Sequence, residues 1–242
     1  MSLLRGPRTA WILLTRVPWP GDVSPLPAAA GWMPVVGAVL GGASAIPLLA
    51  LRPLGLPVAA AAAVGTEVLL TGALHWDGFA DCCDALVAGG DRERRLGVMR
   101  DPRLGSGGVL GLVLGMTAML ALLWRAGGTP AADAITLVAA AAALARWAVV
   151  VAAALLPPAD PGRGIGRELA GRIRWPAVVG ASLVAAAAAL ACGHPAAFAA
   201  AGLAGYGTAV YLSRPLGGAN GDVFGATAIA AQLAALGAMT WR

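Results

Sequence analysis

Five ionisable side chains lie close together in the sequence, at the end of a long apolar segment: Glu67, His75, Asp77, Asp81 and Asp84. Ionisable groups at a membrane boundary cost free energy, so we interpret this stretch as a functional site. On an ideal helix, the three Asp residues fall within about 60° of one face. The residue types and spacing therefore predict a row of carboxylates along one side of a helix.

Carboxylates on one helix face repel each other, and three of them stay ionised only if a cation lies among them. Clusters of oxygen ligands suit hard cations such as Mg²⁺ or Mn²⁺. Glu67 would join this face, widening the arc to about 100°, if one helix ran unbroken through Gly72 and Gly78. The alternative is a wet helix end with three solvated acids, but the regular spacing and the apolar flanks favour a metal site.

The elements that must position these acids are membrane helices. The chain has 242 residues, of which 59% are hydrophobic, and its mean hydropathy of +0.77 is far above that of a soluble domain. Its apolar runs are continuous rather than alternating and reach the roughly 20 residues that cross a bilayer. We predict an all-α, polytopic membrane bundle that forms a single catalytic domain over residues 1–242.

Seven apolar segments predict about seven transmembrane helices, with an interfacial helix before them at Ser2–Val17. The segments are Trp32–Leu51, Pro57–Leu74, Gly107–Trp124, Pro130–Leu156, Trp175–Cys192, Ala196–Ser213 and Val223–Trp241. The last of them could instead be re-entrant.

All seventeen basic residues are Arg. They concentrate in the N-terminal segment and in the loops after the second, fourth and sixth predicted spans, including Arg92, Arg163 and Arg214. By the positive-inside rule, these loops face the cytoplasm of a bacterial inner membrane. The net charge of +5 therefore reflects topology rather than nucleic-acid binding. The three cysteines show no metal-site spacing and no disulfide framework.

The loop after the acids could bind an anion. It reads RERRLGVMRDPRLGSGG, and backbone N–H groups at the helix start after Gly105 could hold a phosphate. Arg100 and Arg103 would add charge and bidentate hydrogen bonds. A metal site beside an anion site suits phosphoryl transfer, in which both neutralise oxygens during an in-line displacement.

Other polar residues have less specific surroundings. On a strict helix, His75 points away from the acids, so its role as base, phosphate donor or headgroup-region residue stays open. Arg146 lies deep in the fourth predicted span and needs a carboxylate or a bound anion. In the loop RPLGGANGDVFGA, glycines surround Asn220 and Asp222, as in a turn that delivers one carboxylate to a site.

Three segments, HWDGFADCCDAL, RERRLGVMRDPRLGSGGVLGLVL and LGGANGDVFGA, together resemble the cobalamin synthase family, the adenosylcobinamide-GDP ribazoletransferases. The resemblance extends from TRVPWP at Thr15–Pro20 to GDVFGA, and HxDGxADxxD with MRDxRxG is its specific part. It implies a Mg²⁺-dependent membrane enzyme of the last stage of coenzyme B12 synthesis. Such an enzyme joins adenosylcobinamide-GDP to α-ribazole or α-ribazole 5′-phosphate and releases GMP.

The resemblance also implies roles for individual residues. The metal-binding acids would be Asp77, Asp81 and Asp84, with His75 beside them as a catalytic residue. The substrate-binding residues would be Asp101, Arg103, Arg146 and Asn220. A carboxylate takes the proton of the attacking hydroxyl, and both Asp84 and Asp222 remain candidates for this base.

Two departures from the family pattern stand out. Asn220 occupies the place of a usual Thr, and the run Ala226–Ala231 lacks an acid that the family often has there. Glu67 is not typical of the family, so we hypothesise that it supplies the missing carboxylate as a fourth metal ligand.

Other functions fit less well. CDP-alcohol phosphotransferases also use an acidic DG-containing helix and Mg²⁺, but this chain lacks their Ala-Arg step after the first DG. A cation transporter should carry acids through the membrane depth, whereas these lie at one end beside Arg-rich loops. A structural scaffold leaves the clustered Asp residues unexplained. The resemblance leaves open a homo-oligomer or an association with other corrinoid-pathway enzymes.

Overall fold

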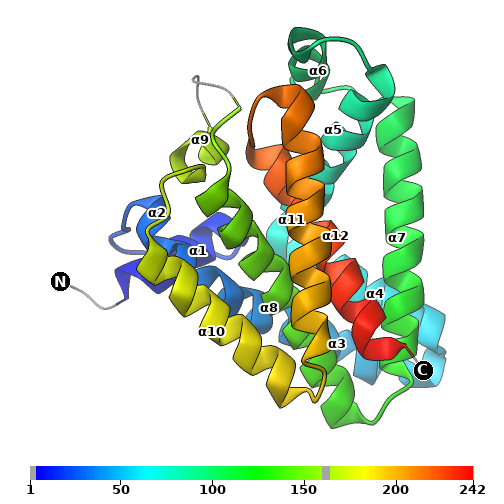
Figure 1. The fold of residues 1–242 in the computed structure, drawn as a ribbon. Helices are drawn as coiled ribbons and strands as arrows, with labels where there is room; N and C mark the ends of the chain where they lie inside the picture. The colour runs from blue at the N-terminus through cyan, green and yellow to red at the C-terminus, as the bar shows by residue number, and fades with distance from the viewer. Residues whose placement is uncertain (1–3, 160–163, 242) are drawn as a thin grey trace.

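The computed structural model describes residues 4–159 and 164–241, so Ser2 and Arg163 lie outside it. Over the described residues the regular elements are helices (Figure 1). They are α1 (Arg5–Leu14), α2 (Leu26–Ala29), α3 (Met33–Ala50), α4 (Leu56–Thr71), α5 (Leu74–Ala88), α6 (Arg92–Met99), α7 (Ser106–Gly127), α8 (Ala131–Leu155), α9 (Ile165–Leu169), α10 (Trp175–Ala191), α11 (Ala196–Leu216) and α12 (Gly221–Thr240).

The predicted class, an all-α polytopic membrane protein, is confirmed, but the number of full spans is smaller than seven. Among the described residues, five helical segments are long and apolar enough to cross a membrane: Leu26–Ala50, α7, α8, α11 and α12. A sixth would be the bent pair α4–α5, and α10 is a shorter apolar helix. Each predicted span therefore has a helix, while two of them are not single full-length spans.

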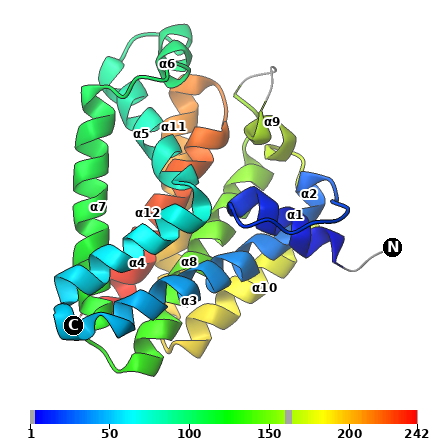
Figure 2. The same cartoon turned by 180° about the vertical axis from the view of Figure 1, so that it is seen from behind.

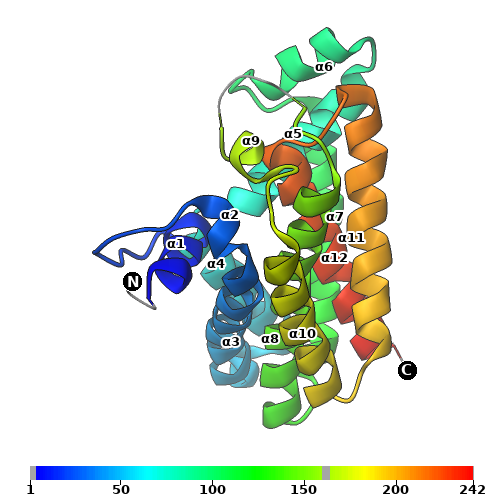
Figure 3. The same ribbon diagram turned by 60° about the vertical axis from the view of Figure 1, so that its left-hand side comes forward.

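Helix α8 is the centre of the bundle. Within its most apolar stretch, 78% of the residues are buried, and α3, α10, α11 and α12 pack around it. Helices α7, α11 and α12 run roughly side by side, whereas α1 and α2 lie to one flank (Figures 1 and 3). Small residues fill α8, for example Ala141, Ala145 and Ala152, and they allow neighbouring helices to approach closely in lipid.

A sharp break separates α4 from α5 and turns the chain by 94°. Gly72 and Ala73 both adopt left-handed conformations, with φ of 64° and 60°, and the Ala73 N–H donates to the Val68 carbonyl at 3.0 Å. This is a Schellman-type helix end, which satisfies a carbonyl that the helix leaves unpaired. The Arg16 N–H donates to the Leu70 carbonyl at 2.7 Å and ties the N-terminal segment to the break. Figure 2 shows α5 leaving the end of α4 in a new direction.

The loops at one end of the bundle are joined to each other. Pro158 and Ala219 form an isolated parallel bridge, in which the Ala159 N–H donates to the Ala219 carbonyl at 2.9 Å. The Arg92 guanidinium donates to the carbonyls of Ala159 and Leu216. Helix α6, helix α9, the end of α5 and the start of α12 consequently gather at this end (Figure 3).

Candidate active site

Three acidic residues from the two halves of the chain lie near the point where α5 packs against the start of α12. A Cβ atom on Gly78 would lie 2.7 Å from the Cα of Asp222, so only glycine allows this approach. Asp77 and Asp81 flank Gly78 on α5, and both interact electrostatically with Asp222. The predicted acid face of α5 is thus present, and Asp222 adds to it from 141 residues or more along the chain.

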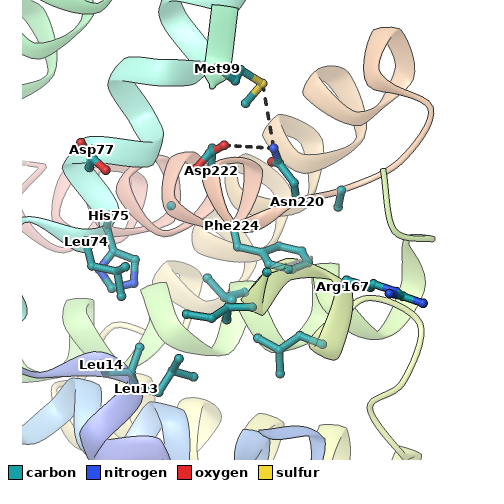
Figure 4. A pocket seen from close by; sticks show the side chains of 18 of the residues that line it. Leu13, Leu14, Leu74, His75, Asp77, Met99, Arg167, Asn220, Asp222 and Phe224 are labelled. Atoms are coloured by element: carbon teal, nitrogen blue, oxygen red, sulfur yellow. Dashed lines mark hydrogen bonds between the residues drawn. The ribbon is translucent and has the colours of Figure 1, made fainter. Parts of the chain in front are cut away.

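Asn220 fixes the position of Asp222. Its side-chain oxygen accepts from the Val223 N–H at 2.9 Å, which makes it the N-cap of α12. Its side-chain nitrogen donates to the Asp222 carboxylate at 3.0 Å and also faces the sulfur of Met99 (Figure 4). One amide therefore both starts the helix and orients the carboxylate.

Asp84 lies on the same face of α5 but points at another helix. Its two carboxylate oxygens accept the backbone N–H groups of Gly105 and Gly108, both at 2.8 Å. These are the amides at the start of α7 that the sequence suggested for a phosphate, so the protein's own carboxylate takes that place. A buried carboxylate at a helix N-terminus is a favourable arrangement in charge and in hydrogen bonding.

Glu67 is engaged as well, in a buried network with the two helices behind α4. One carboxylate oxygen accepts from Arg146 on α8 at 2.8 Å, and the other accepts from the Gln232 amide on α12 at 2.9 Å. Arg146 also donates to the Gln232 oxygen at 3.2 Å, which closes a three-membered ring of side chains. Because Arg146 is only 1% exposed, its guanidinium obtains the carboxylate that its burial requires. The break after α4 removes Glu67 from the acid face of α5.

These contacts decide which residues fit a metal ion. Within the described part of the chain, no group of three or more His, Cys, Asp or Glu side chains is placed to hold a metal by itself. Mg²⁺, however, is commonly bound through one or two carboxylates together with substrate phosphates and water. Asp77 and Asp81 accept no hydrogen bond from any described side chain, which leaves their oxygens for such an ion.

Asp101 and Arg103 pair with each other at the surface. Arg103 donates to both carboxylate oxygens of Asp101, at 2.9 and 2.6 Å, and its side chain is 87% exposed. These hydrogen bonds lower the pKa of Asp101 to about 2, so the pair stays ionised at any physiological pH. Neither residue is among the described residues that line the cavity next to the acids, and their predicted role in substrate binding stays a prediction.

A cavity of about 380 Å³ opens beside Asp77 and Asp222. Its polar lining residues include Asp77, Asp222, Asn220, Arg100 and Arg167. Its other side is apolar and comes from α1, α3, α8, α9 and α12; this side includes Leu13, Leu14, Met33, Val149, Leu169 and Phe224. In Figure 4 the Asp77 and Asp222 carboxylates lie on one side and Leu13 and Leu14 on the other.

His75 lies between these two sides. It is buried in the first turn of α5, and its ring points away from Asp77 and toward the apolar side of the cavity (Figure 4). The orientation agrees with the prediction that His75 would point away from the acids. No pattern in the sequence marks Gln232 or Arg167 as a site residue, because each is brought in by an element far away in the chain.

The chain is similar to known proteins over nearly its whole length. Residues 6–240 match the model of the family described as cobalamin-5-phosphate synthase. Among curated relatives, the adenosylcobinamide-GDP ribazoletransferase of Allorhizobium ampelinum is 36% identical, over 89% of this chain and 85% of the relative. The relatives of the same name from Azorhizobium caulinodans and Leptothrix cholodnii are 40% and 37% identical, over 80% and 91% of this chain and 76% and 89% of their own lengths. No solved structure is significantly similar to the chain.

Proposed function

This chain belongs to the cobalamin-5-phosphate synthase family, and we propose that it is a Mg²⁺-dependent adenosylcobinamide-GDP ribazoletransferase whose reaction occurs at the carboxylates between α5 and α12. The enzyme transfers the adenosylcobinamide-phosphate part of adenosylcobinamide-GDP to α-ribazole or α-ribazole 5′-phosphate. The products are adenosylcobalamin, or its 5′-phosphate, and GMP.

Asp77 and Asp81 are the proposed metal-binding residues. Bound Mg²⁺ would neutralise charge on the diphosphate oxygens of the GDP-activated corrinoid. The sequence also suggested Asp84 and Glu67 as metal ligands. We do not include them, because both oxygens of each carboxylate accept hydrogen bonds from other groups of the protein. Their roles are to anchor α7 and to neutralise Arg146.

Arg100 and Arg167 supply positive charge on the polar side of the cavity. A diphosphate that entered there would come close to two arginine residues, a residue type that matches phosphate oxygens in geometry as well as in charge. Arg146 is unsuited to this task because it is buried on α8 and already paired with Glu67.

Asp222 is the proposed base. It lines the cavity and is oriented by Asn220, whereas Asp84 is occupied by the start of α7. The 3′-hydroxyl oxygen of ribazole forms a bond to the phosphorus on the corrinoid side, and the bond from that phosphorus to the bridging oxygen breaks. Asp222 accepts the hydroxyl proton, and GMP leaves with the bridging oxygen.

One observation carries this proposal: Gly78 lets Asp222 at the start of α12 approach the α5 turn that carries Asp77 and Asp81, beside a cavity that is also lined by two arginines. The protein is a multi-pass membrane protein. We further propose that its membrane is the bacterial inner membrane and that the joined loops face the cytoplasm, because Arg is concentrated at this end.

The test is turnover in nanodiscs. Purified protein receives adenosylcobinamide-GDP and α-ribazole with Mg²⁺ or with EDTA, and GMP release is measured. We expect Mg²⁺-dependent GMP release that falls by at least a hundredfold in Asp81→Asn and Asp222→Asn, the size of effect typical for a lost catalytic group. The matched control is Glu93→Gln, which removes an exposed acid of α6 at the same end of the molecule.

The outcomes separate the parts of the proposal. Full activity in EDTA would refute the metal, and full activity of Asp222→Asn would refute the base. Absence of GMP from folded wild-type protein would refute the reaction itself.

A further inference from the structure

The cavity beside the carboxylates is lined by exposed polar residues and by deeply buried apolar residues. Asp77 and Arg100 are exposed at the polar end, whereas Leu14, Met33 and Phe224 are at most 4% exposed. A molecule that entered would therefore leave its charged part near the acids and bury its apolar part against α1, α3 and α12.

The volume of the cavity indicates which of the two organic substrates of the proposed reaction can fit inside it. Small-molecule pockets measure roughly 300–1,000 Å³ and enclose most of a drug-sized ligand, so this cavity of about 380 Å³ is near the lower limit. Ribazole, a riboside of dimethylbenzimidazole, is of that size. A corrin ring with its amide side chains is much larger and would not fit.

We propose that the apolar end of this cavity is the ribazole subsite, in which Leu14, Met33, Val149 and Phe224 enclose the dimethylbenzimidazole base. The inference rests on the proposed function. In this arrangement the ribose lies at the polar end with its 3′-hydroxyl next to Asp222. The corrinoid stays outside, and only its diphosphate reaches the acids.

His75 supplies the polar contact that such a base needs. Neither of its ring nitrogens bonds to a described residue, and its ring faces the apolar side of the cavity (Figure 4). The base has one ring nitrogen that carries no substituent and can accept a hydrogen bond. A ring N–H of His75 that donates to this nitrogen would fix the orientation of the base, because a buried polar atom requires a partner.

The experiment measures ribazole binding separately from turnover. Isothermal titration in nanodiscs gives the Kd of α-ribazole for wild type, for Leu14→Trp, which fills the apolar end, and for the control Leu114→Trp, which changes a 70% exposed side chain of α7. We expect Leu14→Trp to raise the Kd and the KM for α-ribazole by at least about tenfold, the size of effect that a misfitted apolar pocket gives. The KM for adenosylcobinamide-GDP should remain within about twofold of the wild-type value.

A second binding measurement uses only the wild-type protein. On the wild-type protein, a riboside of benzimidazole without the two methyl groups should bind about tenfold or more weakly than α-ribazole, because each methyl group loses its apolar contact. Equal binding of the two ribosides would overturn the subsite. An increase in KM for adenosylcobinamide-GDP alone in Leu14→Trp would do the same. If Leu14→Trp selectively loses ribazole binding while the wild-type protein releases no GMP, the subsite is supported and the proposed reaction is refuted.

Discussion

Replacing Glu67 by Gln tests the buried network most directly. The substitution keeps the shape of the side chain but removes the charge that neutralises Arg146, which is 1% exposed. Breaking a buried ion pair by removing one partner costs about 3–5 kcal/mol, since the remaining charge is left uncompensated. The Glu67 side chain is 15% exposed, so we take the lower end, about 3 kcal/mol.

The expected result is a lower thermal stability with an unchanged metal requirement. For a chain of this size each kcal/mol shifts Tm by about 2–4 °C, so Glu67→Gln should lower Tm by roughly 6–12 °C. The assay is a thermal melt in detergent followed by tryptophan fluorescence. It is paired with the Mg²⁺ concentration that gives half-maximal GMP release. The exposed Glu93→Gln serves as the control in both measurements.

A double variant distinguishes a lost partner from a general loss of packing. Arg146→Met combined with Glu67→Gln removes both charges, and replacing a buried pair by groups of similar volume is often neutral or stabilising. Its Tm should therefore return to within a few degrees of wild type. A wild-type Tm for the single variant, or a raised Mg²⁺ requirement, would refute this reasoning and restore Glu67 as a metal ligand.

Asp84→Asn should lower thermal stability by about 1–2 kcal/mol through the lost cap of α7 and leave the Mg²⁺ requirement unchanged; a raised requirement would place Asp84 among the metal ligands. Gly78→Ala should abolish GMP release from protein that still inserts and melts cooperatively, because its new Cβ would push α5 away from Asp222; normal turnover would show that this contact is not needed. The folded-state pKa of Asp101 is lowered to about 2 by Arg103, so the stability from this pair is present above the unfolded-state pKa and lost only as pH falls through about 2. Asp101→Asn should consequently leave the dependence of Tm on pH unchanged between pH 5 and 8, and a changed slope there would contradict the assignment.

Local periodicity predicted the parts of the site that one helix supplies. The spacing of Asp77, Asp81 and Asp84 placed them on one helical face because all three lie within two turns. The burial of Arg146 similarly predicted a carboxylate or an anion as its partner. The identity of that partner, Glu67, did not follow, because the sequence does not say which spans become neighbours.

The rest of the site depends on backbone geometry that side-chain patterns do not encode. Gly72 is a recognisable helix end, but the second left-handed residue is Ala73, for which this conformation is unfavourable and gives no signal in the sequence. The 94° turn that separates Glu67 from the acids was therefore missed. The contact between Asp84 and the start of α7 was also missed, since it pairs two elements that are each normal alone.

The ring of Glu67, Arg146 and Gln232 also has a consequence for the time at which the protein is made. Glu67 leaves the ribosome 79 residues before Arg146 and 165 residues before Gln232. At a synthesis rate of about 5–20 residues per second, Arg146 is made roughly 4–16 s after Glu67, and Gln232 is made about 8–33 s after Glu67. During this interval an acid at the end of an apolar helix has neither partner, so α4 must keep Glu67 at the hydrated boundary of the membrane. The acid-bearing half of the site is thus synthesised first and becomes complete only when the last helix is inserted.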